Sequence, residues 1–292
     1  MTAISLATVE RDGDRRVAVV HAGNAFLLSP ATTMRGLLAD WRRNLEKVRK
    51  DLDSCRLGDP VRLDTLQLLP PVTDPPNLFM AGANYRDHLA EMGNTNPPIR
   101  GRDRPFIFLK SPSSLAGDGD EIHPPAESGK VDWEAELGVV LGDGGRIAGY
   151  TVVNDLSCRD IWRRENTPPT FTWDWLLQKS WVTACPCGPW LVPADQVADP
   201  YDLALRLTVN GEVMQNSNTG QMIFRAEDMI EYLSAYLPLQ PGDIIATGTC
   251  AGTGAGRGRF LRPGDVMVAE IEGIGRLRNR VAVSFRSDAR DG

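Results

Sequence analysis

Hydrophobic and polar residues alternate along most of the chain in short runs, a pattern typical of β-strands with one buried face. Residues 3–28 alternate in this way around Gly and Asp turn signals, which predicts a small β meander. From residue 77 onward, apolar runs separated by Gly, Pro and Asp predict further short strands. Asn210-Gly211 lies between two alternating runs and predicts a tight hairpin turn, because this dipeptide accepts positive φ angles.

Two segments carry a helical period instead. One helix is predicted over residues 32–52 and another within residues 226–243, where prolines stop it. The apolar positions that define them are Met34, Leu37, Leu38 and Trp41 in the first and Met229, Leu233 and Tyr236 in the second. The predicted fold class is therefore mostly β with some α, closing into a sandwich or barrel-like roll. A Pro-rich connector places a domain boundary near residue 70, which gives a small N-terminal α/β domain (1–70) and a main domain (71–292).

Composition and charge narrow the classes of function. The 292 residues are 42% hydrophobic and 24% charged, as in ordinary globular proteins. The net charge of −6 argues against nucleic acid as a partner, because phosphate backbones require a basic surface. No apolar run approaches the roughly 20 residues that span a bilayer, so no membrane partner is expected. Five scattered cysteines, Cys185 and Cys187 among them, and no recognisable signal peptide favour the cytoplasm, with the thiols used for packing.

Acidic residues repeat at every second position just before a strongly apolar run. Asp132, Glu134 and Glu136 would share one face of a strand, and Asp155 closes the next predicted strand in the same manner. Carboxylates this close repel one another, and a divalent cation removes that penalty. Oxygen-only ligands favour Mg²⁺, Mn²⁺ or Ca²⁺ over zinc. A solvated strand face is the alternative interpretation of such a pattern taken alone.

From residue 77 to about residue 283, the chain resembles the fumarylacetoacetate hydrolase family. Segments in the family's order carry the resemblance: "NLFMAGANYRDHLAEMG", "PFIFLKSPSSLAGDGDEIHPP", "VDWEAELGVVLG", "GYTVVNDLSCRD", "LLQKSW", "VNGEVMQ" and "LQPGDIIATGT". The resemblance implies a mixed β-roll that holds Mg²⁺ or Mn²⁺ through Glu134, Glu136 and Asp155. It also implies chemistry on oxo acids through an enolate next to a carboxylate, which a metal ion stabilises.

His88 and Glu91 are the candidate base. Three residues apart on a short helix, they lie on one face, and a carboxylate bound to one imidazole nitrogen makes the other nitrogen a better base. The resemblance places this pair on a lid over the substrate.

Further site residues follow from the resemblance or from nearby motifs. The resemblance makes Lys179 the catalytic-site lysine, which would neutralise an enolate or hold a substrate oxygen. Thr249, at the end of a strand, and Arg86, just before the lid, are candidate ligands of substrate carboxylates, although a solvated Arg86 is an equal alternative. Lys110 and Ser114 are expected to support the site.

The chain departs from the family pattern at three places. Trp162 stands where the family's substrate-contacting glutamine is usual, so it is expected to contact substrate, and its bulky ring should narrow the pocket and remove one hydrogen bond. Val182 replaces an aspartate, and Cys250 and Thr253 alter the closing loop. With Trp162, the aromatic residues Phe171, Trp173 and Trp175 suggest either interface or core packing, or a pocket for a bulkier and more apolar substrate.

The sequence therefore predicts a Mg²⁺- or Mn²⁺-dependent enzyme that acts on a small-molecule 2-oxo or 2,4-dioxo carboxylate. Hydrolytic cleavage of a carbon–carbon bond is favoured, because His88 and Glu91 are both present to activate water. An oxo-acid decarboxylase, isomerase or hydratase is the alternative, and a non-catalytic binding member of the fold is a second one. The resemblance also implies a homodimer.

Overall fold

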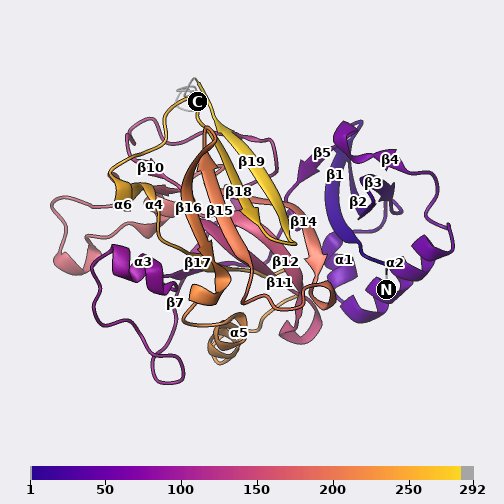
Figure 1. The fold of residues 1–292 in the computed structure, drawn as a ribbon, viewed down its shortest axis with the longest axis horizontal. Coiled ribbons are helices and arrows are strands. Elements are labelled where there is room, and N and C mark those ends of the chain that lie inside the picture. The colour runs from indigo at the N-terminus through magenta and orange to yellow at the C-terminus, as the bar shows by residue number, and fades with distance from the viewer. Residues whose placement is uncertain (1, 284–292) are drawn as a thin grey trace.

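The structure, a computed structural model, describes residues 2–283 and is mostly β with some α (Figure 1). The largest sheet has twelve strands, ten of them in the order β4 (Val61–Arg62), β3 (Asn24–Leu27), β2 (Asp14–His21), β1 (Ser5–Arg11), β14 (Cys185–Pro193), β12 (Ile147–Asn154), β11 (Ala135–Leu141), β17 (Ile244–Thr249), β6 (Leu78–Gly82) and β7 (Phe106–Lys110). Beside this path, β5 (Gln67–Leu69) pairs with β1, and β8 (Leu115–Ala116) pairs with β14.

A second sheet of five strands follows the order β16 (Glu212–Asn218), β15 (Ala204–Val209), β18 (Val266–Ile271), β19 (Gly275–Val281) and β9 (Glu121–Ile122). A short pair joins β10 (Val131–Asp132) to β13 (Ser157–Cys158). The helices are α1 (Met34–Leu38), α2 (Trp41–Asp53), α3 (Arg86–Glu91), α4 (Trp175–Lys179), α5 (Ala226–Ser234) and α6 (Gly254–Arg257).

The two larger sheets pack face to face, with β15, β16, β18 and β19 in front of β11, β12 and β17 in Figure 1. All seven residues of β11 are buried, because the strand is covered on both faces. Leu137 and Val139 point into the core between the sheets, whereas Val140 belongs to a second core beneath α1 and α2. Among residues 2–283 both sheets are open, so the mixed sheets are confirmed and a closed barrel is not seen.

Local predictions met different outcomes. The hairpin turn is confirmed: Asn210 and Gly211 have φ angles of 52° and 84°. The single helix over residues 32–52 is wrong, because the chain breaks at Asp40, where the Asp143 carboxylate accepts the backbone N–H of Trp41 (3.1 Å). The second helix ends at Ser234, so Tyr236 is exposed and not part of a buried stripe.

The N-terminal residues continue the main sheet, because β1 lies beside β14. They also form a small cluster of their own, with Val9, Ala18 and Ala25 at its centre. A bidentate ion pair connects α2 to the main body: the Arg49 guanidinium donates to both Asp195 oxygens at 2.6 and 2.8 Å. The separation into domains at residue 70 stays a prediction.

Replacing Arg49 with methionine should reduce stability in a pH-dependent way. The hydrogen bonds from Arg49 lower the pKa of Asp195, so this contribution is present above the carboxyl's unfolded pKa of about 3.9 and is lost as pH falls through the folded value. Asp195 is half-exposed, so solvent screening limits the loss at pH 7 to about 1 kcal/mol. Urea unfolding at pH 7 and below pH 4 checks this: the difference from wild type should shrink in acid, and Arg42→Met, on the exposed face of α2, should show none.

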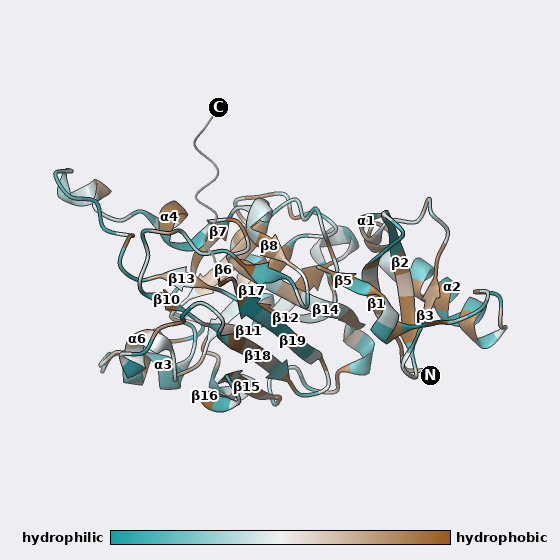
Figure 2. Ribbon diagram, turned by 90° about the horizontal axis from the view of Figure 1, so that it is seen from above, coloured by the Kyte–Doolittle hydropathy of each residue, from teal (hydrophilic) through white to brown (hydrophobic). Residues whose placement is uncertain are grey.

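No helix among residues 2–283 is both long and apolar enough to cross a bilayer. Apart from α5, the described helices instead lie in two groups along the molecule. In Figure 1 and in the perpendicular view of Figure 2, α3, α4 and α6 gather at the end remote from α1 and α2. The strands β6, β12 and β17 end towards this first group, which places the loops that follow them around one site.

Candidate metal centre and active site

Strand ends bring three carboxylates together. Glu134 immediately precedes β11, and Glu136 is the second residue of this strand, where it pairs with Thr249 of β17. Asp155 follows the last residue of β12. Because β11 runs antiparallel to both β12 and β17, its beginning meets their ends. One ligand oxygen from each carboxylate lies within 4.8 Å of the others, and all three side chains are buried. These are the three residues predicted to bind metal.

Asp132 does not join them. The expectation of one strand face carrying three acids is wrong, because the strand is interrupted at Trp133 and Glu134. The Asp132 carboxylate turns instead to the first turn of α6, where it accepts the backbone N–H of Gly254 (2.5 Å) and Ala255 (3.1 Å), and it also accepts from Arg159 (2.9 Å). Asp132 thus anchors the start of α6 rather than the carboxylate cluster.

Three cationic side chains hold the cluster. The Lys179 ammonium donates to Glu134 and to Asp155, at 2.7 Å each. Lys110 donates to the other Asp155 oxygen at 2.5 Å and to two backbone carbonyls, so its expected supporting position is seen. Arg159 donates to Glu134 through a further guanidinium nitrogen. The Ser114 hydroxyl donates to the Ser111 carbonyl, and Ser114 is not among the residues that line the cavity.

The charges of this buried region do not balance once Asp132 is counted, because it shares Arg159 with Glu134 and four carboxylates then face three cations. Lys179 and Arg159 outweigh the burial of Glu134 and lower its pKa. Glu136 receives only the backbone N–H of Gly248 (2.7 Å) among the described residues, and burial, followed by the charges of Asp155 and Glu134, raises its pKa well above the usual range. The ionised form of Glu136 is therefore disfavoured in this arrangement, and a divalent cation bound beside it would stabilise that form.

The His88–Glu91 pair forms one wall of the site. His88 Nδ1 lies 3.2 Å from a Glu91 oxygen on α3, which leaves Nε2 available to the cavity. Glu91 is itself fixed, because it accepts the Gly252 N–H (2.9 Å) and the Thr253 hydroxyl (3.3 Å). The closing loop thereby holds Glu91 in position beside His88, the candidate base. The sequence did not indicate this contact of Thr253.

Gly256→Ala should displace the Glu91 carboxylate from its contacts with the closing loop and with His88. A Cβ at Gly256 would lie 2.3 Å from the Glu91 carboxyl carbon, so the carboxylate would have to leave its partners. Turnover should fall by up to about 100-fold, because small displacements of reacting groups have effects of this size, whereas Mn²⁺ affinity and melting temperature should stay near wild type. Ala255→Ser, at the exposed neighbouring position, is the matched control; wild-type turnover in Gly256→Ala would show that Glu91 is not needed where it lies.

A cavity of about 230 Å³ opens above the carboxylates. Its lining includes the predicted residues His88, Glu134, Glu136, Asp155, Lys179 and Thr249, and Trp175, one of the aromatic residues suggested for an apolar pocket. It also includes Arg159, Met92, Phe106 and Phe108, which sequence reasoning missed as site residues. Arg159 could have been sought as the charge partner of so many acids. The Thr249 hydroxyl already donates to the Ala135 carbonyl (2.8 Å) and accepts from Gln215 (2.8 Å).

Two predicted substrate ligands lie elsewhere. Trp162 stacks on Trp173 with ring centroids 4.0 Å apart, and its indole N–H donates to the Arg159 carbonyl, so it does not narrow the cavity as expected. Arg86 donates to the Met222 carbonyl (3.0 Å) on the far side of α3 from the cavity lining. Their contact with substrate stays a prediction.

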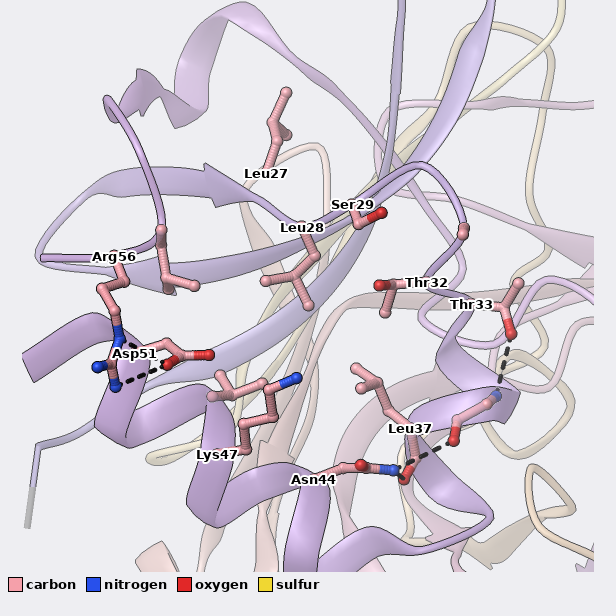
Figure 3. A pocket seen from close by; sticks show the side chains of 14 residues that line it. Leu27, Leu28, Ser29, Thr32, Thr33, Leu37, Asn44, Lys47, Asp51 and Arg56 are labelled. Atoms are coloured by element: carbon pink, nitrogen blue, oxygen red, sulfur yellow. Dashed lines mark hydrogen bonds and ion pairs between the residues drawn. The ribbon is translucent and has the colours of Figure 1, made fainter. Parts of the chain in front are cut away.

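A larger hollow of about 470 Å³ lies in the N-terminal region (Figure 3). Leu28, Leu37, Lys47, Asp51 and Arg56 are among the residues that line it, and Arg56 is paired to Asp51 at 3.0 Å. It contains no cluster of ligating groups comparable to that of the carboxylate centre.

The cysteines take no part in these sites. All five are free, and Cys185 and Cys187 are buried in the core beneath α1 and α2, as the packing prediction requires. Val182 is exposed, outside the cavity lining.

Fold and site define a β-sandwich protein with an oxygen-lined candidate cation centre. The family model "Fumarylacetoacetate (FAA) hydrolase C-terminal" matches residues 77–282. The chain belongs to the fumarylacetoacetate hydrolase family.

Individual relatives cover nearly the whole chain. It is 43% identical over 270 residues to "Oxaloacetate tautomerase FAHD2A, mitochondrial" of Homo sapiens, covering 88% of this chain and 82% of that protein. Among solved structures, the fumarylacetoacetate hydrolase of Exiguobacterium antarcticum matches with a TM-score of 0.78 and 31% identity over 97% of this chain and all of that one. Maleylpyruvate hydrolase of Sphingobium sp. SYK-6, in complex with manganese(II) and pyruvate, matches with a TM-score of 0.76 and 27% identity over 95% and 98%.

Proposed function

We propose that this protein is a divalent-metal-dependent enzyme that forms the enol of a 2-oxo carboxylate, with keto–enol interconversion of oxaloacetate as its first candidate reaction. The observation that carries the proposal is the buried cluster of Glu134, Glu136 and Asp155 at the floor of a cavity whose wall holds His88. The oxaloacetate tautomerase relatives support the choice of substrate.

Mg²⁺ or Mn²⁺ fits the residues present. The donors are carboxylate oxygens only, which suits hard cations, and the local excess of negative charge favours a divalent ion. Glu134, Glu136 and Asp155 would hold it. When bound, the ion would supply Lewis-acid polarisation of the 2-oxo group. The manganese-containing relative supports this assignment.

The chain's own groups would perform the proton transfers. Glu91 fixes the proton on His88 Nδ1, so that Nε2 can remove a proton from the carbon next to the 2-oxo group and later return it. Lys179, with its ammonium between Glu134 and Asp155, would balance the negative charge that develops on the oxo oxygen. Arg159 lines the cavity and would hold a substrate carboxylate.

Hydrolytic cleavage of a 2,4-dioxo carboxylate is the second candidate. The same His88–Glu91 pair that can move a proton at carbon can also take a proton from an attacking water. The similarity to maleylpyruvate hydrolase supports this alternative. Decarboxylation would require the enol-forming groups but no activated water.

Parallel assays of Mn²⁺-loaded protein distinguish these reactions. The conversion of enol-oxaloacetate to the keto form, pyruvate release from oxaloacetate and cleavage of acetylpyruvate would be followed by absorbance at equal enzyme concentration. The proposal expects the first reaction to be the fastest. Cleavage of acetylpyruvate as the dominant activity would establish the hydrolase instead. If the protein catalysed none of the three reactions, with or without Mn²⁺, a binding protein would be favoured.

We also propose a homodimer in a reducing cytoplasm. Large apolar side chains are exposed around the edge strand β7 and the loops beside α4: Leu109, Phe171, Trp173 and Val182. Covering an edge strand and an apolar surface of this kind is typical of subunit pairing. Light scattering of the purified chain tests it, and a monomer at micromolar concentration would contradict it.

A further inference from the structure

The cavity has two chemically different halves. Its inner half carries the carboxylates, Lys179, Arg159 and His88, whereas its outer half is lined by Met92, Phe106, Phe108 and Trp175. Phe106 and Trp175 are 54% and 41% exposed, so the apolar half lies at the mouth. The reaction proposed above uses only the inner groups, and it leaves the aromatic wall without a role.

The three aromatic rings form one continuous surface. The Trp175 ring centroid lies 5.1 Å from that of Phe108 and 5.6 Å from that of Phe106, and each pair is tilted by less than 50°. The wall also reaches the charged floor, because the Lys179 ammonium is 5.5 Å from the Phe108 centroid.

Local structure fixes these rings in relation to the reacting groups. Trp175 and Lys179 are the first and last residues of α4, four positions apart, and therefore lie one above the other on one helix face. Asp174 caps this helix by accepting the Leu177 N–H (2.9 Å). The two side chains thus leave the helix about one turn, roughly 5 Å, apart along its axis, so a group bound against Trp175 would lie beside the charged part of the cavity.

The strand beneath the wall is adapted to it. Phe106 and Phe108 are two positions apart in β7 and therefore lie on the same face of the strand, and Phe106 pairs with Gly82 of β6. A Cβ at Gly82 would lie 2.8 Å from the Phe106 ring, so glycine leaves the space that this ring occupies beside the cavity. The wall is therefore part of the packed structure and not a chance exposure of single side chains.

We propose that Phe106, Phe108 and Trp175 form a subsite for an apolar, preferably aromatic, substituent on carbon 3 or beyond of the oxo acid. This deepens the proposed function and rests on it. The 2-oxo carboxylate end of the substrate would lie among the charged groups, and the substituent would extend along the rings towards the mouth of the cavity. Aryl- or alkyl-substituted oxo acids should thus bind more tightly than pyruvate, because their substituents bury apolar surface against the rings.

Ligand affinity tests this without depending on turnover. Pyruvate and phenylpyruvate would be titrated into the Mn²⁺-loaded full chain by calorimetry, since they differ by one phenyl group on carbon 3. Burial of a phenyl group should make phenylpyruvate bind about 10- to 100-fold more tightly. Trp175→Ala should remove at least about tenfold of this preference and leave pyruvate affinity unchanged, whereas Trp175→Phe should retain most of it.

Leu176→Ala is the matched control, because Leu176 is the next residue of α4, is 70% exposed and does not line the cavity. Both affinities should be unchanged in this variant. Equal binding of the two acids by the wild type, or equal losses for both in Trp175→Ala, would overturn the subsite while leaving the oxo-acid proposal standing. If neither acid binds the Mn²⁺-loaded wild type, the proposed function fails and the subsite fails with it.

Discussion

Glu136→Gln is expected to abolish turnover and to weaken Mn²⁺ binding by at least about 100-fold. Changes to groups that merely support metal ligands already have effects of up to this size. Glutamine can still accept the Gly248 N–H, so the local hydrogen bond is kept while the anionic ligand is lost. The fold should be retained, because the substitution also removes a buried like charge next to Glu134 and Asp155.

The measurements are Mn²⁺ titration by electron paramagnetic resonance, oxaloacetate turnover and thermal melting. Asp243→Asn is the matched control, because Asp243 is equally buried, precedes β17 and lies outside the cavity. It should bind Mn²⁺ like the wild type. Unchanged Mn²⁺ affinity in Glu136→Gln would remove Glu136 from the ligand set.

His88→Ala is the second substitution with a large expected effect. Loss of a positioned base should lower turnover by about 100- to 10,000-fold. Mn²⁺ affinity should not change, because His88 is absent from the carboxylate cluster. This split between lost activity and retained metal separates a base from a metal ligand.

His123→Ala provides the comparison, because His123 is exposed and lies outside the cavity lining. It should keep wild-type turnover and metal affinity. Full residual turnover in His88→Ala would exclude His88 from the mechanism, and loss of Mn²⁺ binding would show a structural effect on the centre instead.

Much of the carboxylate centre could be predicted from the sequence because its signals are local. Glu134 and Glu136 precede an apolar strand, and Asp155 ends the next one, so hairpin pairing alone brings them together. The His88–Glu91 contact was predictable for the same reason, since three residues on a helix suffice. Lys179 is far from the carboxylates in sequence, and only the resemblance indicated it.

Contacts between distant segments could not be predicted. Asp143 divides the N-terminal helix at Asp40 from about a hundred residues away, and nothing in the local helical period reveals it. The aromatic wall combines β7 with α4, so the sequence suggested an apolar pocket that included Trp175, but it also included Trp162 and Trp173 and left out Phe106 and Phe108. The role of Asp132 also depends on a segment that is distant in sequence, because its partners Gly254 and Ala255 lie in the first turn of α6.

The central claim is that a divalent cation held by Glu134, Glu136 and Asp155 enables enol formation. Its most direct test measures oxaloacetate tautomerisation by chelator-treated protein as Mn²⁺ is added back, with bound ion counted in the same samples. The account predicts negligible activity without metal and a rise in proportion to occupancy of one site per chain. Full activity in metal-free protein, or saturating Mn²⁺ occupancy without any gain in activity, would contradict it.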